Sequence, residues 1–356
     1  MDTSEQVVVG HEALRAFVET TFRQAGSSAR EAALVAEQLV GANLAGHDSH
    51  GVGSIPVYLR NVASEDLVLN QELSVVLESG PLLVCDGNGG AGQVMGHDAV
   101  ARGIARAREE GACVLGLRNS HHLGRIGHWA EQCAAAGLVS VHFVNVISTP
   151  SVAPFGGTAA RLGTNPFAVG IPRAGQRPII VDFATSKLAV GKVRVARNGG
   201  AQLPPDVLLT ADGQPTRDPA VLFGTPKGVL LPFGEHKGWG LGLACELLGA
   251  ALTGGLTQSG PKRRNAVINN MLSVIVSPER LGTEASYFDE IERFVAWALS
   301  AGNRDVLLPG DPEAANRARR MAEGIPVDGK SWADIVEAAA MFGAHPPPGL
   351  RLPAGS

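Results

Sequence analysis

The chain has 356 residues, of which 45% are hydrophobic and 18% charged, a composition typical of folded rather than disordered proteins. At this length it can bury a sizeable core and form two domains. The formal net charge of −4 argues against nucleic acid as a partner. The opening segment MDTSEQVVVG lacks the basic and apolar regions of a secretory signal, and the four cysteines form no C-x-x-C pair. We therefore expect a cytoplasmic protein with reduced thiols that binds neither nucleic acid nor membrane.

The N-terminal segment predicts helices. Residues 10–45 form two of them, separated near Gly26, and the second begins at a serine followed by Glu31, the arrangement of a capping box. A third helix is predicted within 51–65, with Pro56 near its start.

From residue 73 the sequence alternates between short apolar runs and helical segments. The predicted strands are 73–79, 81–86, 112–118, 139–146, 167–172, 178–184 and 271–278. The predicted helices are 96–110, 127–136, 238–251, 285–301, 312–323 and 331–341. The long apolar stretch 238–256 contains Glu246 and many small residues, so we interpret it as a buried helix rather than a membrane span. This pattern predicts a mixed α/β fold.

The order of these elements predicts a simple partition. Residues 1–72 and 285–345 form a helical domain built from both chain ends, and residues 73–284 form a central α/β domain. Residues 346–356, which are rich in proline, form a loose tail.

The glycines Gly87, Gly89 and Gly92 have the G-x-G-x-x-G spacing of a dinucleotide-binding loop. Glycine makes up 45 of the 356 residues, so this spacing is expected by chance about once in such a chain. The next predicted strand ends in Arg118 and Asn119 instead of the acidic residue that would hold a ribose, although an arginine could suit a 2′-phosphate. We therefore favour a glycine-rich turn between a strand and a helix over a Rossmann fingerprint.

Two glycine-rich loops concentrate histidine. They are GHDSHG at 46–51, with His47, Asp48, Ser49 and His50, and NSHHLGRIGH at 119–128, with His121, His122 and His128. Imidazole is the side chain best matched to proton transfer near neutral pH, so we expect these loops to meet at a cleft. The alternative is a zinc site made by His47 and His50 with His121 or His122. No H-E-x-x-H motif accompanies them, and we expect no metal.

Seven segments in chain order resemble the malate/L-lactate dehydrogenase family of NAD(P)-dependent oxidoreductases, which includes ureidoglycolate and sulfolactate dehydrogenases. The segments are LAGHDSHGVGSIPVY, RNSHHLGRIGHWAEQCAAAG, RLGTNPFAVGIPR, VDFATSKLAVGKVRVA, DGQPTRDP, PFGEHKGWGLGLACELLGAALTGG and LLPGDPEAANRARRMAEGIPVD. The resemblance spans about 10–340 and implies a family-specific, non-Rossmann sheet domain that binds cofactor and substrate, beside a helical domain. It further implies a homodimer with the active site between domains.

The activity that this resemblance implies is hydride transfer between NAD(P)H and a 2-oxo acid or 2-hydroxy acid of the malate, lactate, 2-oxoglutarate or aryl-pyruvate kind. The cofactor is NAD or NADP, with NAD favoured. Two alternatives stay open: a histidine-ligated metallohydrolase, and a reductase of a cyclic imino acid.

The resemblance carries catalytic roles onto named residues. His50 matches the proton donor, with Ser49 beside it, and Asp182 matches an acidic partner that would hydrogen-bond the histidine and raise its pKa. The other interpretation of Asp182 is that it ends a strand and caps the next helix. His122 matches a histidine to which other members assign catalysis, and it is the second candidate.

The implied cofactor site draws on several segments. Thr185 and Ser186 are expected to open a helix whose free N–H groups accept a pyrophosphate. His236 and Lys237 precede another helix start, and a turn at 309–313 begins a helix at Pro312. The full implied set is His50, Gly124, Arg125, Ile126, Val181, Asp182, Phe183, Ala184, Thr185, Ser186, His236, Lys237, Gly238, Asn269, Gly310, Asp311, Pro312 and Glu313.

The substrate side departs from the family at one position. Many members carry an arginine for the substrate carboxylate where this chain has Ser54, while Tyr58 is retained. Arg125 occupies a position that is often small in those members, and we expect it to supply the missing bidentate contact. The alternative is that Arg125 is exposed and structurally idle. Thr164 and Asn165 are expected to line the same cleft.

Overall fold

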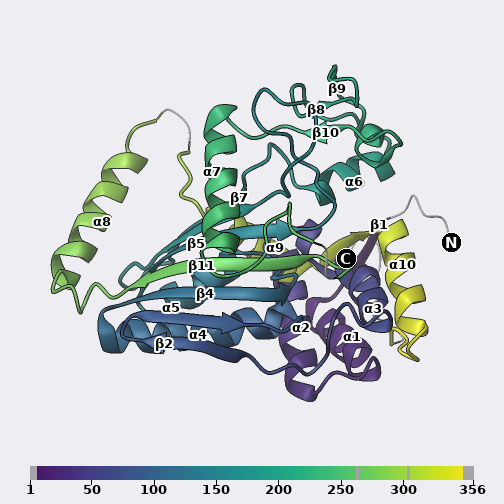
Figure 1. Cartoon of the computed structure of the whole chain (residues 1–356). Helices are drawn as coiled ribbons and strands as arrows, with labels where there is room; N and C mark the ends of the chain where they lie inside the picture. The colour runs from purple at the N-terminus through teal and green to yellow at the C-terminus, as the bar shows by residue number, and fades with distance from the viewer. Residues whose placement is uncertain (1–5, 262–263, 303–304, 348–356) are drawn as a thin grey trace.

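A computed structural model describes residues 6–261, 264–302 and 305–347. Its centre is a seven-stranded sheet in the order β2-β3-β4-β11-β5-β6-β7 (Figure 1). The strands are β2 (Ser74–Ser79), β3 (Leu82–Asp86), β4 (Ala112–His121), β5 (Val139–Ile147), β6 (Pro166–Ile171), β7 (Ile179–Ala184) and β11 (Ile268–Val276). Among these strands β3 and β4 alone pair in parallel. The mixed α/β class is confirmed, and the largely antiparallel sheet differs from the parallel sheet of a Rossmann domain.

Helices cover both faces of this sheet. In Figure 1, α4 (Gly92–Glu110) and α5 (Gly127–Ala135) lie below it and α7 (His236–Glu246) stands above it. The helix predicted over 238–251 begins two residues earlier, at His236, and becomes a π-helical turn over Leu247–Ala251. Within the described ranges, no helix combines the length and apolar character needed to cross a bilayer.

The glycine-rich loop packs against the second histidine loop. It joins β3 to α4, and a Cβ atom on Gly92 would lie 2.1 Å from the backbone oxygen of His122. Glycine is therefore required for close packing between the start of α4 and the end of β4. This contact supports the interpretation of the loop as a structural turn.

Segments from both ends of the chain lie together beside the sheet. They are β1 (Gln6–Val9), α1 (His11–Gln24), α2 (Ala29–Leu44), α3 (Ile55–Ala63), α9 (Asp311–Glu323), β12 (Ile325–Asp328) and α10 (Gly329–Ala340). β1 pairs with β12, α9 packs on α2, and α10 packs on α3. One apolar core runs from α1 through the sheet to α10. In contrast, α8 (Glu284–Leu299) lies at the far end of the sheet in Figure 1, so the expected partition with 285–345 does not describe this helix.

A second, smaller apolar core defines a lobe that the sequence analysis missed. This small lobe, residues 150–162 and 188–232, contains α6 (Val190–Asn198), the 3-10 helix η3 (Pro219–Phe223) and a sheet of β8 (Leu208–Leu209), β9 (Pro215–Thr216) and β10 (Val229–Leu230). The prediction that Thr185 and Ser186 open a helix is wrong, because α6 begins only at Val190. Both hydroxyls instead donate to backbone oxygens, those of Asn165 and Leu188. Of the predicted tail, residues 348–356 lie outside the described residues.

Candidate active site

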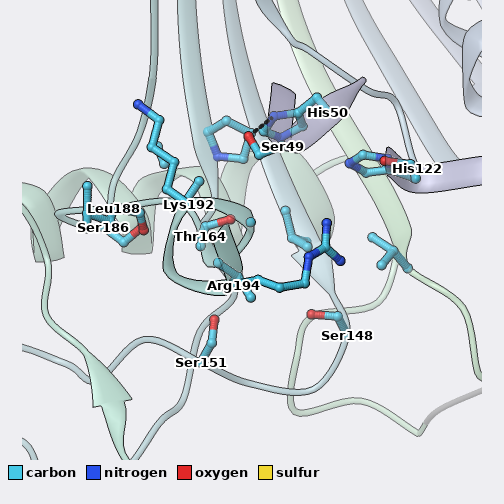
Figure 2. A pocket seen from close by; sticks show the side chains of 18 of the residues that line it. Ser49, His50, His122, Ser148, Ser151, Thr164, Ser186, Leu188, Lys192 and Arg194 are labelled. Atoms are coloured by element: carbon cyan, nitrogen blue, oxygen red, sulfur yellow. Dashed lines mark hydrogen bonds between the residues drawn. The ribbon is translucent and has the colours of Figure 1, made fainter. Parts of the chain in front are cut away.

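A cavity of about 850 Å³ lies where the small lobe meets the edge of the main sheet (Figure 2). Its lining residues come from 47–61, 121–126, 146–151, 164–166, 182–194, 222–233 and 267–269. Both predicted histidine loops therefore contribute to one cavity, whereas the glycine-rich loop 87–92 does not line it.

The first histidine loop is held rigidly. His50 lies in a 3-10 turn, η1 (Asp48–His50), at the end of α2, and its Nδ1 is 2.9 Å from Ser49 Oγ. The Asp48 carboxylate accepts hydrogen bonds from Asn43 of α2 and from both terminal nitrogens of Arg320 in α9. His47 Nε2 lies 3.0 Å from Glu313 Oε1, also in α9. Helices from both chain ends thus fix the turn that presents Ser49 and His50 to the cavity.

The second loop places His122 against the first. The His50 and His122 rings are stacked, with centroids 5.6 Å apart and an interplanar angle of 20°. Nδ1 of His122 lies 2.6 Å from the buried Tyr58 hydroxyl, which also accepts a 3.1 Å hydrogen bond from Gln93 Nε2. If that hydroxyl donates to Nδ1, the neutral His122 ring carries its proton on Nε2.

Both rings are uncharged at neutral pH. Desolvation lowers the pKa of His50 to about 4, and electrostatic interactions with His47, Arg125 and Lys192 act in the same direction. Desolvation also lowers the pKa of His122 well below its ordinary value. The free site therefore holds two neutral imidazoles.

Asp182 does not have the contact predicted for it. The expected hydrogen bond to His50 is absent among the described residues, where Ser49 is the partner of that ring, and Oδ2 of Asp182 instead accepts from the Gly127 backbone N–H at 2.9 Å. Desolvation raises the pKa of Asp182, and the charge of Arg125 opposes the rise. The predicted increase in the pKa of His50 is therefore wrong for the free site, since no carboxylate bonds its ring.

Arg125 is buried, so the alternative that it is exposed and idle is wrong. Its Nη2 lies 2.5 Å from Glu131 Oε2, and its Nη1 lies 3.8 Å from Asp182 Oδ2. Nη1 has no hydrogen-bond partner among the described residues although it is buried at the cavity wall. A buried guanidinium nitrogen without an acceptor favours an anionic oxygen at that position.

The two residues of the 163–166 segment have different positions. Thr164 lines the cavity, as predicted. Asn165 does not, because its amide is used inside the protein: Nδ2 donates to Glu246 Oε2 at 2.8 Å, and Oδ1 accepts from Val146 N at 2.9 Å. Asn165 therefore positions the strands behind the cavity.

The residues implied for the cofactor divide into two sets. Those that line the cavity are His50, Gly124, Arg125, Ile126, Asp182, Phe183, Ala184, Ser186 and Asn269. Those that do not are Val181, Thr185, His236, Lys237, Gly238, Gly310, Asp311, Pro312 and Glu313. His236 and Lys237 are exposed in the first turn of α7 rather than preceding the helix, and the 309–313 turn lies along β7, where Ile180 N donates to Pro309 O at 3.1 Å.

The chemistry of the cavity fits an anionic dinucleotide. Lys187, Lys192, Arg194 and Lys227 line it and form no ion pair with any residue that the structure describes. Asp182 is the single carboxylate in the described lining, and Arg125 lies next to it. The exposed ring of Phe183 on the edge strand β7 adds an apolar surface. Uncompensated cations beside an apolar wall suit the phosphates and rings of a nicotinamide dinucleotide.

The histidines do not form a metal cluster. In the part of the chain that the structure describes, no group of three or more His, Cys, Asp or Glu side chains is placed to hold an ion. His47 contacts Glu313, His121 contacts Asn61, and His122 contacts Tyr58.

Sequence reasoning missed the cations of α6. Lys192 and Arg194 are absent from the predicted site, although the run VGKVRVA places two basic residues directly after the segment assigned to the cofactor. These two basic residues are visible in the sequence. They can be assigned to the site only when the structure shows that α6 packs against the histidine turn.

Comparison with known proteins identifies the architecture. The sequence model described as malate/L-lactate dehydrogenase matches residues 9–336. Hydroxycarboxylate dehydrogenase B of Escherichia coli O157:H7 is 45% identical over 93% of this chain and 93% of its own length. The L-lactate dehydrogenase of Cupriavidus necator is 42% identical over 80% of this chain and 84% of its own length. The structure of malate dehydrogenase from Pyrococcus horikoshii superposes with a TM-score of 0.87 at 25% identity, covering 98% of both chains.

Proposed function

The chain belongs to the malate/L-lactate dehydrogenase family, and from that premise we propose that it is a 2-hydroxycarboxylate dehydrogenase transferring hydride between a nicotinamide dinucleotide and a 2-oxo or 2-hydroxy acid. The observation that carries the proposal is a pair of stacked, neutral imidazoles beside a buried arginine, all lining one cavity, with the arginine's Nη1 lacking a hydrogen-bond partner among the described residues. The two relatives named above are a hydroxycarboxylate and a lactate dehydrogenase by name, and neither is a metallohydrolase. A cyclic imino acid reductase of Pseudomonas syringae is 36% identical over 84% of this chain, and the dehydrogenases named above are the more similar.

The arginine and the two histidines of the cavity have distinct roles in this reaction. A nicotinamide held in this cavity would supply or accept the hydride. Arg125 holds the substrate carboxylate through Nη1, next to the reacting carbon. In oxidation of a 2-hydroxy acid, neutral His50 accepts the hydroxyl proton as general base, and Ser49 orients its ring. His122, with its proton on Nε2, donates a hydrogen bond to the same oxygen. In reduction His50 must first take up a proton.

The roles of the remaining polar residues follow from their contacts. Asp182 lies within 4 Å of Arg125 and fixes the guanidinium against the cavity wall. Tyr58 holds the tautomer of His122, and Thr164 offers a hydroxyl to the substrate. Asn269 lines the cavity while its Oδ1 accepts from Leu123 N, so it positions the second histidine loop.

The cofactor is NAD or NADP, and NAD is the choice we favour. Residues of the cavity wall, the 309–313 turn beside β7 and the exposed start of α7 would hold it. His236 and Lys237 at that helix start offer an imidazole and an ammonium to its phosphates.

We also propose a cytoplasmic homodimer. The four cysteines are free and buried, which suits a reducing compartment. Large apolar side chains are exposed on α8 and on the helical stretch that includes α7: Phe294 at 59%, Trp297 at 71% and Leu247 at 47%. Apolar surface of this kind marks subunit contacts. Trp297→Glu should convert a dimer to a monomer in analytical ultracentrifugation.

The function is tested by mixing the purified protein with NADH or NADPH and a panel of 2-oxo acids, cyclic imino acids and ureidoglycolate-type substrates. Oxidation of the dinucleotide by 2-oxo acids, lost in His50→Gln, supports the proposal. Turnover that is sensitive to chelators and indifferent to either dinucleotide would refute it.

A further inference from the structure

Four cations that line the cavity, Lys187, Lys192, Arg194 and Lys227, have no role in the mechanism above, and Arg194 is the single arginine among them. Arg194 lies in α6 of the small lobe, and in Figure 2 its side chain points into the cavity, whereas the Lys192 side chain points to another side. Arg194 is half-buried and forms no ion pair or hydrogen bond with the residues that the structure describes. A half-buried guanidinium without an anion among the described residues is available to a ligand.

The position of Arg194 is fixed by the packing of α6 on the catalytic turn. A Cβ atom on Gly191 would lie 2.4 Å from Ser49 Cβ and 3.0 Å from Ser49 Cα, so α6 contacts the Ser49–His50 turn directly. Gly191 and Arg194 are three residues apart and therefore share one face of the helix. Val193 is fully buried in the core of the small lobe, so the neighbouring side of α6 packs on that lobe.

The two arginines of the cavity come from different parts of the molecule. Arg125 belongs to the second histidine loop and is joined to Asp182 and Glu131. Arg194 comes from the small lobe, with no carboxylate beside it among the described residues. A substrate that has its 2-oxo group at the histidines and its first carboxylate on Arg125 can direct the rest of its chain toward α6.

We propose that Arg194 is a specificity-determining residue, which binds a second carboxylate at the far end of the substrate and so favours dicarboxylic over monocarboxylic 2-oxo acids. This inference rests on the proposed function, because it takes the histidines and Arg125 as the reaction centre. A guanidinium binds a carboxylate through two parallel hydrogen bonds, a geometry that lysine cannot reproduce. A monocarboxylic substrate would leave Arg194 hydrated at little cost, since the side chain is not fully buried.

The same cation could instead bind a phosphate of the dinucleotide, and the experiment separates these two sources of negative charge. Its substrates are 2-oxoglutarate and 2-oxopentanoate, which have the same chain length and differ in having a carboxylate or a methyl group at C5. The variants are Arg194→Gln, Arg194→Lys and the control Arg197→Gln, which removes the same charge from an exposed position of α6, where Arg197 stacks on Phe223. NADH affinity is measured separately by fluorescence titration.

Arg194→Gln should lower kcat/KM for 2-oxoglutarate by about 10- to 100-fold, the effect of losing a charge-assisted bidentate contact. It should change kcat/KM for 2-oxopentanoate by less than about 3-fold and leave NADH affinity unchanged, because the contact is made only with the distal carboxylate. Arg194→Lys should recover part of the loss, and Arg197→Gln should behave as wild type.

Equal losses for both substrates, or weaker NADH binding with an unchanged substrate ratio, would overturn the inference and leave the proposed function standing. Equal kcat/KM for the two substrates in the wild type would also overturn the inference about Arg194 and leave the proposed function standing. A wild-type enzyme that is inactive on every 2-oxo acid would overturn the proposed function and this inference with it.

Discussion

Replacing Gly92 by alanine tests whether the glycine-rich loop serves a cofactor or positions His122. The new methyl group would lie 2.1 Å from His122 O and 2.6 Å from His121 O. Ordinary C···O contacts are about 3.3 Å, so the end of β4 and the start of α4 must separate by about 1 Å. Overpacking of this kind costs about 1–3 kcal/mol of stability. A 1 Å displacement of a catalytic group lowers the rate by about 100-fold.

We therefore expect Gly92→Ala to lower kcat by about 100-fold and Tm by several degrees, with NADH affinity close to that of the wild type. The assay is NADH oxidation with a saturating 2-oxo acid, combined with thermal unfolding. The matched control is Gly41→Ala in α2, where an added Cβ meets no atom within 4 Å. That substitution should stabilise the helix by about 0.5–1 kcal/mol and leave kcat unchanged. A Gly92→Ala variant with full kcat but weakened NADH binding would refute the reasoning and restore the cofactor interpretation of the loop.

Three further predictions concern the reaction centre. Tyr58→Phe leaves His122 Nδ1 and Gln93 Nε2 unpaired, so it should destabilise the protein by about 1–3 kcal/mol and lower kcat by about tenfold or more, measured by denaturant unfolding and steady-state kinetics. Because the pKa of His50 is lowered to about 4, the base form persists on acidification, and kcat/KM for 2-hydroxy acid oxidation should stay level from pH 8 to about pH 5.5; an inflection near the ordinary histidine pKa of about 6.5 would contradict this. Arg125→Lys keeps the charge, but its single ammonium cannot bond Glu131 and the substrate carboxylate in the positions that Nη2 and Nη1 of the guanidinium take, so KM for 2-oxo acids should rise about 10- to 100-fold with NADH affinity unchanged, and unaltered kinetics would end that role.

The central sheet and the histidine loops are visible in the sequence. The strands of the sheet are continuous apolar runs between turn residues, so the pattern of residues predicts them directly. The convergence of the two histidine loops is also predictable, because glycine-rich segments that both concentrate an uncommon side chain suited to proton transfer are expected to serve one site. His50 and His122 do face each other, 5.6 Å apart between ring centroids.

Other features depend on long-range packing that no local pattern encodes. β1 and β12 are four residues each and pair across almost the whole chain, so neither shows a period of its own. The small lobe has strands of two residues, too short for alternation to be visible. The strand pattern around Asp182 is the same whether its carboxylate bonds a histidine or a backbone N–H. The partner is set by the position of Gly127, which lies far away in the sequence and donates its N–H to this carboxylate.

The charges of the cavity link substrate binding to proton uptake by His50. Desolvation lowers the pKa of His50 in the free site, nearby Arg125 and Lys192 add to the effect, and Asp182 does not bond its ring. A substrate carboxylate placed on Arg125 brings a negative charge close to His50, and an opposite charge favours the protonated ring. Binding of the anion and protonation of His50 must then promote each other by the same factor. In the proposed reaction, burial together with the nearby cations favours the base form of His50 in the free site, and the negative charge of a bound 2-oxo acid favours the acid form that reduction requires.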